Sequence, residues 1–133
     1  YIRIANDQEM LEMALIENIQ RENLNPIEVS LSYKRLIDEC SLKQEELGER
    51  VGKDRSTVSN YLRLLRLPEQ VQLGIKIGKI SLGHAKAIMG VEDPEDQIAL
   101  YKRIELDGLS VRGTEEIVKQ IQMMDKNISR LPG

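Results

Sequence analysis

The 133 residues carry a net charge of −3, an apolar fraction of 41%, one cysteine and one histidine. A single cysteine excludes an internal disulfide and a zinc site of clustered cysteines, and a single histidine argues against a histidine-rich metal site. With no apolar run of membrane-spanning length, the sequence predicts a cytoplasmic protein of one domain, or one domain with a loosely attached element.

The chain reads as a succession of short helices, so the predicted fold class is all-α, a multi-helix bundle. Residues 1–4 are β-prone and short. Capping residues and helix-initial prolines mark the expected helix starts, namely Asn6 or Asp7, Asn25 with Pro26, Ser41, Asp54, Glu69 after Pro68, Ser81, Asp93 with Pro94, and Ser110. The helices are expected to end near Gln20, Cys40, Gly52, Leu67, Gly78, Gly90, Gly108 and Met124.

The first helix, residues 7–20, is apolar around more than half of its circumference, at Met10, Leu11, Met13, Ala14, Leu15, Ile16 and Ile19. Such a helix is expected to be buried on two sides, and it predicts self-association if no other partner covers it. The next helix, residues 26–40, is expected to bury Ile27, Leu31, Leu36 and Ile37.

Residues 41–67 have the spacing of a helix-turn-helix. Ser41 is a candidate N-cap with Gln44 closing a capping box, and Gly52 favours a left-handed helix end. Gly48 lies between inward-facing apolar residues, at a point where a side chain would hold a crossing segment away. In the second helix, Val58, Leu62 and Leu65 form an apolar stripe with Tyr61 at its edge.

The other face of this second helix carries side chains that bond to phosphates and base edges: Ser56, Ser59, Asn60 and Arg63, with Arg55 and Thr57 at its leading end. This layout predicts that the N-terminal part of the helix enters the major groove of DNA. The alternative is an ordinary helical hairpin with a solvated polar face.

The charge distribution fits nucleic acid better than the total suggests. Residues 41–90 hold nine Lys/Arg and five Asp/Glu, a net +4, whereas residues 1–40 carry −4 and residues 91–133 carry −3. The positive charge is thus concentrated around the predicted helix-turn-helix, and local charge governs contact with phosphates.

Two further groups are candidate sites. Glu17, Asn18 and Arg21 lie within about one helical turn and could hold a metal–phosphate group or activate a water; the alternative is a solvated helix end with an i,i+4 pair from Glu17 to Arg21. Gly83, His84 and Lys86 follow Lys79 at a helix start that could face a phosphate. The alternative there is a histidine bonded to a local carbonyl and a solvated lysine.

The chain resembles the ParB family of centromere-binding partition proteins, in the branch that also contains the nucleoid-occlusion protein Noc. The resemblance covers residues 4–119. It rests on the blocks ALIENIQRENLNPIE, LKQEELGERVGKDRSTVSNYLRLLRLP, GKISLGHAKAI and GLSVRGTEEIVK, which occur in order with matching gaps.

The resemblance implies a domain that binds a palindromic parS site as a homodimer in chromosome segregation, associated with the nucleoid, with a ParA-type ATPase as a partner of other regions. The implied DNA-binding residues are Lys53, Arg55, Ser56, Thr57, Ser59, Asn60, Tyr61, Arg63, Arg66, Lys79, Gly83, His84 and Lys86. Among them, Arg55, Tyr61, Arg66 and Gly83 match positions where ParB and Noc differ. Arg55 and Gly83 are ParB-like, whereas Arg66 is less so, and a Noc-like protein is the alternative.

Family members are also CTP-dependent clamps. The resemblance implies that Glu17, Asn18 and Arg21 handle the triphosphate and Mg²⁺, with Glu17 in the hydrolytic role. The family's Gly-Glu-Arg-Arg phosphate motif and C-terminal dimerisation domain are not in this sequence, which is expected to be a piece of a longer chain. We therefore expect no cofactor and no resident metal in the piece itself, and no CTP turnover. The predicted division is 1–24 for a nucleotide-domain remnant, 25–124 for DNA binding and 125–133 for a linker.

Overall fold

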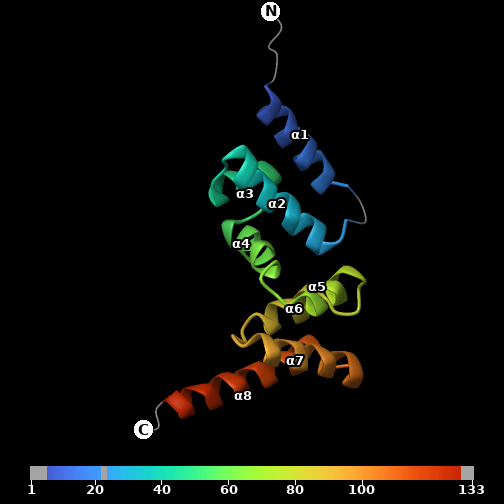
Figure 1. Ribbon diagram of the computed structural model, residues 1–133, viewed down its shortest axis with the longest axis vertical. Coiled ribbons are helices and arrows are strands. Elements are labelled where there is room, and N and C mark those ends of the chain that lie inside the picture. Colours follow the sequence, from blue (N-terminus) through green and yellow to red (C-terminus); the bar gives the residue numbers. More distant parts are fainter. Residues whose placement is uncertain (1–5, 22–23, 130–133) are drawn as a thin grey trace, which may run out of the picture. The chain divides into compact units, whose positions relative to one another are not determined.

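The structure, a computed structural model, describes residues 6–21 and 24–129. Within these ranges every regular element is an α-helix, which confirms the all-α prediction (Figure 1). The helices are α1 (Asp7–Ile19), α2 (Pro26–Cys40), α3 (Gln44–Val51), α4 (Arg55–Leu64), α5 (Glu69–Lys76), α6 (Leu82–Ile88), α7 (Pro94–Asp107) and α8 (Val111–Ser129). The expected β-prone segment 1–4 lies outside the described residues.

The chain divides into two compact units, Tyr1–Leu65 with α1 to α4 and Arg66–Gly133 with α5 to α8. In the first unit, α2 is central and packs against α1, α3 and α4 (Figure 1). Its core is aliphatic apart from Tyr33 and Cys40, and its fully enclosed members include Leu36, Leu47 and Val58. The ring of Tyr61 meets Tyr33 edge to face at a centroid distance of 5.5 Å, a favoured aromatic geometry.

Helix α1 is attached to the first unit on one side only. Leu15 lies in the core, and Gln8 Nε2 donates to the Cys40 carbonyl at 2.7 Å. By contrast, 59% of Met10 and 66% of Met13 are exposed. The expected burial of this helix on two sides is therefore not met within the unit.

Most of the predicted helix starts are confirmed by their capping bonds. The side chains of Asn6, Asn25, Ser81 and Asp93 each accept from a backbone N–H of the first turn. Ser110 does the same for α8, where the Gly113 N–H donates to its Oγ at 3.0 Å.

The predicted start of α3 is wrong. Ser41 adopts a left-handed conformation (φ 57°) and ends α2, instead of capping α3 with Gln44. Helix α3 begins after Lys43, whose N–H donates to the Glu46 carboxylate at 3.4 Å. The end of α2 has Ser41 in the left-handed position that glycine usually takes. The N-cap of α3 is Lys43, whose side chain cannot accept a hydrogen bond, so the sequence lacks the usual signal for both helix ends.

Three further details differ from the sequence prediction. Leu31 faces solvent with 48% of its surface exposed. The deepest residue in the last turn of α4 is Leu64, which is buried, whereas Leu65 is only half-buried. Helix α8 continues to Ser129, beyond the expected end at Met124, so regular helix covers part of the stretch expected to be a linker. The functional division at residues 24 and 124 stays a prediction.

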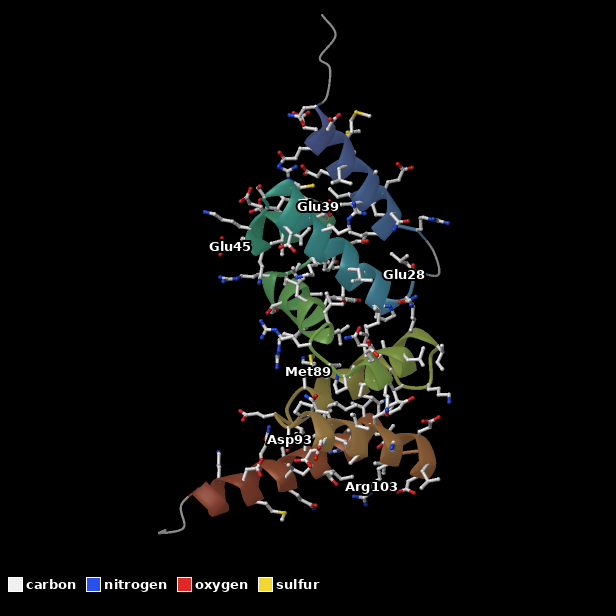
Figure 2. All side chains as sticks on the ribbon, in the orientation of Figure 1. Glu28, Glu39, Glu45, Met89, Asp93 and Arg103 are labelled. Carbon is white, nitrogen blue, oxygen red and sulfur yellow. The ribbon has the colours of Figure 1, made fainter. Side chains whose placement is uncertain are left out.

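In the second unit, α6 packs against α8, and α5 and α7 complete the group. Gly74 permits the closest approach: a Cβ built there would lie 2.4 Å from the Tyr101 ring. Buried polar groups are bonded, since Gln97 Nε2 donates to the Val91 carbonyl at 2.7 Å and Thr114 Oγ1 donates to the carbonyl of the residue four positions earlier. Side chains such as Arg103 point outward (Figure 2).

Over residues 6–21 and 24–129, no helix is both long enough and apolar enough to cross a membrane.

Candidate nucleic-acid interface

A tight turn joins α3 to α4 and fixes their spacing. Gly52 ends α3 with φ 71°, and the Lys53 N–H donates to the Gly48 carbonyl at 2.8 Å. A Cβ at Gly48 would lie 2.6 Å from the Lys53 carbonyl oxygen, closer than real Cβ contacts come. Gly48 therefore allows the close approach of the turn, and Gly52 allows the left-handed helix end, as the helix-turn-helix pattern predicted.

Helix α4 presents one apolar and one polar face. Val58 and Leu64 are buried, and Tyr61 is half-buried against the core. The predicted DNA-binding residues are on the remaining surface: Arg55, Ser56 and Arg63 are exposed, and Thr57, Ser59 and Asn60 are half-buried. Asp54 stands at the N-cap, although its carboxylate makes no bond to the first turn.

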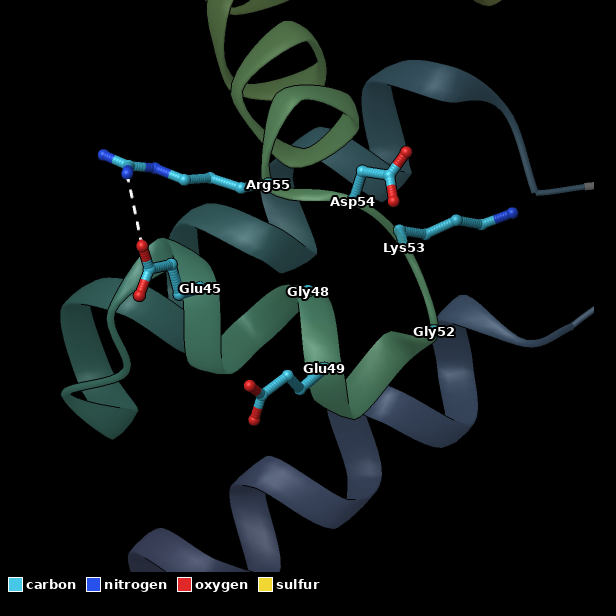
Figure 3. Close-up of a pocket in the computed structure, with 7 residues that line it drawn as sticks. All are labelled: Glu45, Gly48, Glu49, Gly52, Lys53, Asp54 and Arg55. Atoms are coloured by element: carbon cyan, nitrogen blue, oxygen red, sulfur yellow. Dashed lines mark hydrogen bonds and ion pairs between the residues drawn. The ribbon is translucent and has the colours of Figure 1, made fainter.

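A shallow pocket of about 400 Å³ lies between α3, the turn and the start of α4 (Figure 3). It is lined by Glu45, Gly48, Glu49, Gly52, Lys53, Asp54 and Arg55. The two cations of the lining point away from each other: Arg55 extends toward Glu45, and Lys53 extends from the opposite side of the turn (Figure 3). Arg55 Nη1 is 3.3 Å from Glu45 Oε1.

The second unit carries the other predicted DNA-binding group. Arg66 and Lys86 are exposed. Lys79 is engaged, because its Nζ lies 2.6 Å from Oε1 of Glu105 on α7. The hydrogen bond within this pair raises the pKa of Lys79 and lowers the pKa of Glu105.

Both ring nitrogens of His84 are used inside the second unit. Nδ1 lies 3.2 Å from the Ser81 N–H and so accepts from it, which assigns the proton to Nε2, 2.8 Å from the Leu109 carbonyl. The ring thus connects the start of α6 to the segment that precedes α8. At Gly83 a Cβ would lie 3.0 Å from the Val111 side chain, so packing within the unit favours glycine there.

The predicted nucleotide residues lie at the end of α1. Glu17 and Arg21 are exposed and Asn18 is half-buried. Arg21 Nη1 donates to Asn18 Oδ1 at 3.3 Å, and in the described ranges this bond takes the place of the i,i+4 pair with Glu17. In those ranges no group of three or more His, Cys, Asp or Glu residues could hold a metal ion.

The acidic partners of the predicted cations could not be found from the sequence. Glu45 lies ten positions before Arg55 and Glu105 lies far from Lys79, so neither pair follows a helical repeat. The ion pair between Glu12 of α1 and Arg50 of α3 likewise joins two helices that are far apart in the sequence. Only the packing of one helix on another brings these groups together.

The chain is similar to known proteins of one family. The family model described as the ParB HTH domain matches residues 22–123. The chain is 46% identical over 125 residues to the chromosome-partitioning protein ParB of Myxococcus xanthus, covering 94% of this chain and 42% of that protein. It is 40% identical over 128 residues to the nucleoid occlusion protein of Listeria monocytogenes, covering 96% and 45%. The chain thus spans less than half the length of these relatives.

The chain is also similar to solved structures of ParB proteins. A C-terminally truncated ParB from Caulobacter crescentus complexed to the centromeric parS site has a TM-score of 0.81 at 42% identity, covering 90% of this chain and 63% of that one. A ParB DNA-binding domain complexed to parS has a TM-score of 0.73 at 44% identity, covering 83% and 88%. The truncated Caulobacter crescentus protein with CTP-γ-S has a TM-score of 0.52 at 42% identity, covering 78% and 56%. This chain belongs to the ParB HTH domain family.

Proposed function

We propose that this chain is the sequence-specific DNA-binding core of a partition protein that recognises a parS-type palindrome in chromosome segregation. The observation that carries the proposal is the two-faced helix α4, whose apolar face is held by the core while its polar face is open from Arg55 to Arg63. The likeness to two ParB structures in complex with parS supports it.

Two kinds of contact have different roles in DNA binding, one giving affinity and the other giving sequence specificity. Lys53 and the other cations around the turn neutralise phosphates, which gives affinity that falls steeply with salt. Arg55, with Asn60, reads base edges, and a bidentate arginine–guanine contact contributes about 1–3 kcal/mol of discrimination. Ser56, Thr57, Ser59, Tyr61 and Arg63 support the docking from the same helix. In the second unit, Arg66, Lys79, Gly83, His84 and Lys86 are proposed to face the duplex as well.

A palindrome calls for two copies. Each copy of the chain would take one half-site, so that the two-fold axis of the DNA is matched by a homodimer. A ParA-type ATPase would be a partner of the whole protein, through regions other than those described above.

Fluorescence anisotropy with two duplexes of equal composition, one parS and one scrambled, tests the proposal at two salt concentrations. We expect tighter binding to parS at both, with both affinities falling as salt rises. Equal affinity for the two duplexes would contradict the proposal, whatever the salt dependence.

The 40% identity to a nucleoid occlusion protein supports a second candidate, a Noc-like DNA-binding protein. The two differ in the site they select, and Arg55, Tyr61, Arg66 and Gly83 are the residues proposed to select it. A nucleoid-occlusion site added as a third duplex separates them: preference for it over parS would favour the Noc-like function.

The likeness to a ParB bound to CTP-γ-S supports a nucleotide site as a further candidate. Glu17, Asn18 and Arg21 would contact the triphosphate and Mg²⁺, with Glu17 as the hydrolytic residue in a complete site. Isothermal titration of the chain and of its Arg21→Ala variant with CTP and Mg²⁺ tests this. Saturable heat that the variant loses supports the site, and absence of such heat in the unmodified chain contradicts it here.

A further inference from the structure

Arg55 forms a contact with Glu45, a residue that has no role in the proposed function. The two side chains come from different helices, and they meet at 3.3 Å although 68% of the arginine and 72% of the glutamate side chain are exposed (Figure 3). Figure 2 shows Glu45 at the outer surface of α3. An exposed ion pair of this kind adds little to folding stability. Its position at the start of α4, the helix proposed to contact base edges, points instead to a role in DNA binding.

The backbone holds the two residues in register. Glu45 is in the first turn of α3 and Arg55 opens α4. The close approach of Gly48 to the Lys53 carbonyl holds α3 against the turn that leads into α4. The contact is therefore a consequence of the helix-turn-helix spacing.

The chemistry of the contact leaves the reading edge of the arginine available. A guanidinium has five N–H donors in a planar fork. The bond to Glu45 uses Nη1, and the edge formed by Nε and Nη2 of Arg55 can still donate two parallel bonds to a guanine. The carboxylate thus restrains a flexible side chain without occupying all of its donors.

We propose that Glu45 is a specificity-determining positioning residue for DNA binding, acting through Arg55. The proposal rests on the proposed function and adds a residue to it. Glu45 acts by pre-orienting the arginine, which lowers the entropy lost when a base edge is read.

The chain contains a matched control. Glu49 lies one helical turn after Glu45, lines the same pocket and carries the same charge, but its carboxylate is turned away from Arg55 (Figure 3). Substituting Glu49 removes one negative charge from the pocket and leaves the contact with Arg55 in place.

The experiment measures the ratio of the affinities for parS and scrambled duplexes by anisotropy. For Glu45→Ala we expect the ratio to fall by about two- to fivefold, the range that an exposed ion pair can supply. Glu45→Gln, which keeps an acceptor oxygen, should retain part of the ratio. Glu49→Gln should tighten binding to both duplexes alike and leave the ratio unchanged. In an Arg55→Ala background, Glu45→Ala should change the ratio no further.

The outcomes separate this inference from the proposed function. An unchanged ratio in Glu45→Ala, an equal fall in Glu49→Gln, or a fall that persists without Arg55 would each overturn the role of Glu45 while parS binding stands. If the unmodified chain does not distinguish the two duplexes, the proposed function fails and this inference falls with it. Thermal melting by circular dichroism verifies that each exposed substitution leaves the chain folded.

Discussion

At the scale of single residues, Arg55 and Lys53 show how position decides the role of a cation. Both flank the same turn, yet they extend from opposite sides of it (Figure 3). Arg55 begins the helix whose polar face is open, and its planar fork can match two acceptors of a base. Lys53 is a point charge in the turn, suited to a phosphate.

Arg55→Ala should therefore weaken binding to parS and flatten the preference over a scrambled duplex, with a loss of about 1–3 kcal/mol on parS. Lys53→Ala should weaken binding to both duplexes by similar factors, because a phosphate contact carries no sequence information. Anisotropy titrations of the two variants at one salt concentration measure this. An equal loss on both duplexes for Arg55→Ala would remove its reading role.

The pair of Lys79 and Glu105 gives a prediction in pH. The hydrogen bond to Lys79 lowers the pKa of Glu105 in the folded chain. Its stabilising effect is therefore present above the ordinary glutamate pKa of about 4.3 and is lost as the pH falls through the lowered value. The partner lysine, whose pKa is raised, loses its contribution only as the solution becomes strongly alkaline.

Urea unfolding should show Glu105→Gln less stable than the unmodified chain at pH 7, with a smaller difference between the two at pH 3. Glu115→Gln, a substitution at an exposed residue of α8 for which no partner is known in the described part of the chain, serves as the control. A difference between Glu105→Gln and the unmodified chain that is the same at both pH values would show that the charge pair is not its source.

At the scale of elements, the sequence predicted helices wherever a short side chain caps the first turn. Asn6, Asn25 and Ser81 mark true starts because each accepts a backbone N–H. The prediction that Ser41 caps α3 was wrong because a serine at a helix boundary is more often an N-cap than a left-handed C-cap. The polar face of α4 was also predictable, since it follows helical spacing. The acidic partners of Arg55 and Lys79 were not, because they depend on how helices pack.

The two glycines of the helix-turn-helix should respond differently to substitution. Gly48→Ala places a Cβ against the Lys53 carbonyl, and we expect it to cost about 1–3 kcal/mol of unfolding free energy. Gly52 has open space but a positive φ, so Gly52→Ala should cost about 1–2 kcal/mol.

Asparagine separates the two causes, because it tolerates a left-handed backbone better than alanine does. Gly52→Asn should therefore be milder than Gly52→Ala, and Gly48→Asn should be worse than Gly48→Ala. Denaturant unfolding measures the four variants. The opposite order at Gly48 would mean that the backbone approach there is not restrictive.

At the scale of the whole molecule, the apolar side of α1 that the first unit leaves uncovered is the feature to explain. Met10 and Met13 are more than half exposed on a helix whose other side reaches the core through Leu15. We propose that this apolar surface contacts another molecule or segment. A second copy of the chain is the occupant that the proposed dimer provides.

Sedimentation velocity should accordingly show self-association that grows with concentration and weakens in the double variant Met10→Ser, Met13→Ser. Leu106→Ser, at an exposed apolar residue on α7, is the matched control and should leave association unchanged. A strictly monomeric chain at high concentration would count against α1 as a contact surface.

Sequence-specific binding by this chain depends most on the polar end of α4 entering a duplex groove. Nuclear Overhauser contacts between side chains of the labelled chain and a parS duplex measure this directly. We predict contacts from Arg55, Ser56 and Asn60 to major-groove base protons, absent with a scrambled duplex. Binding to parS in which these side chains show no contact to the bases, while other surfaces of the chain do, would contradict the account.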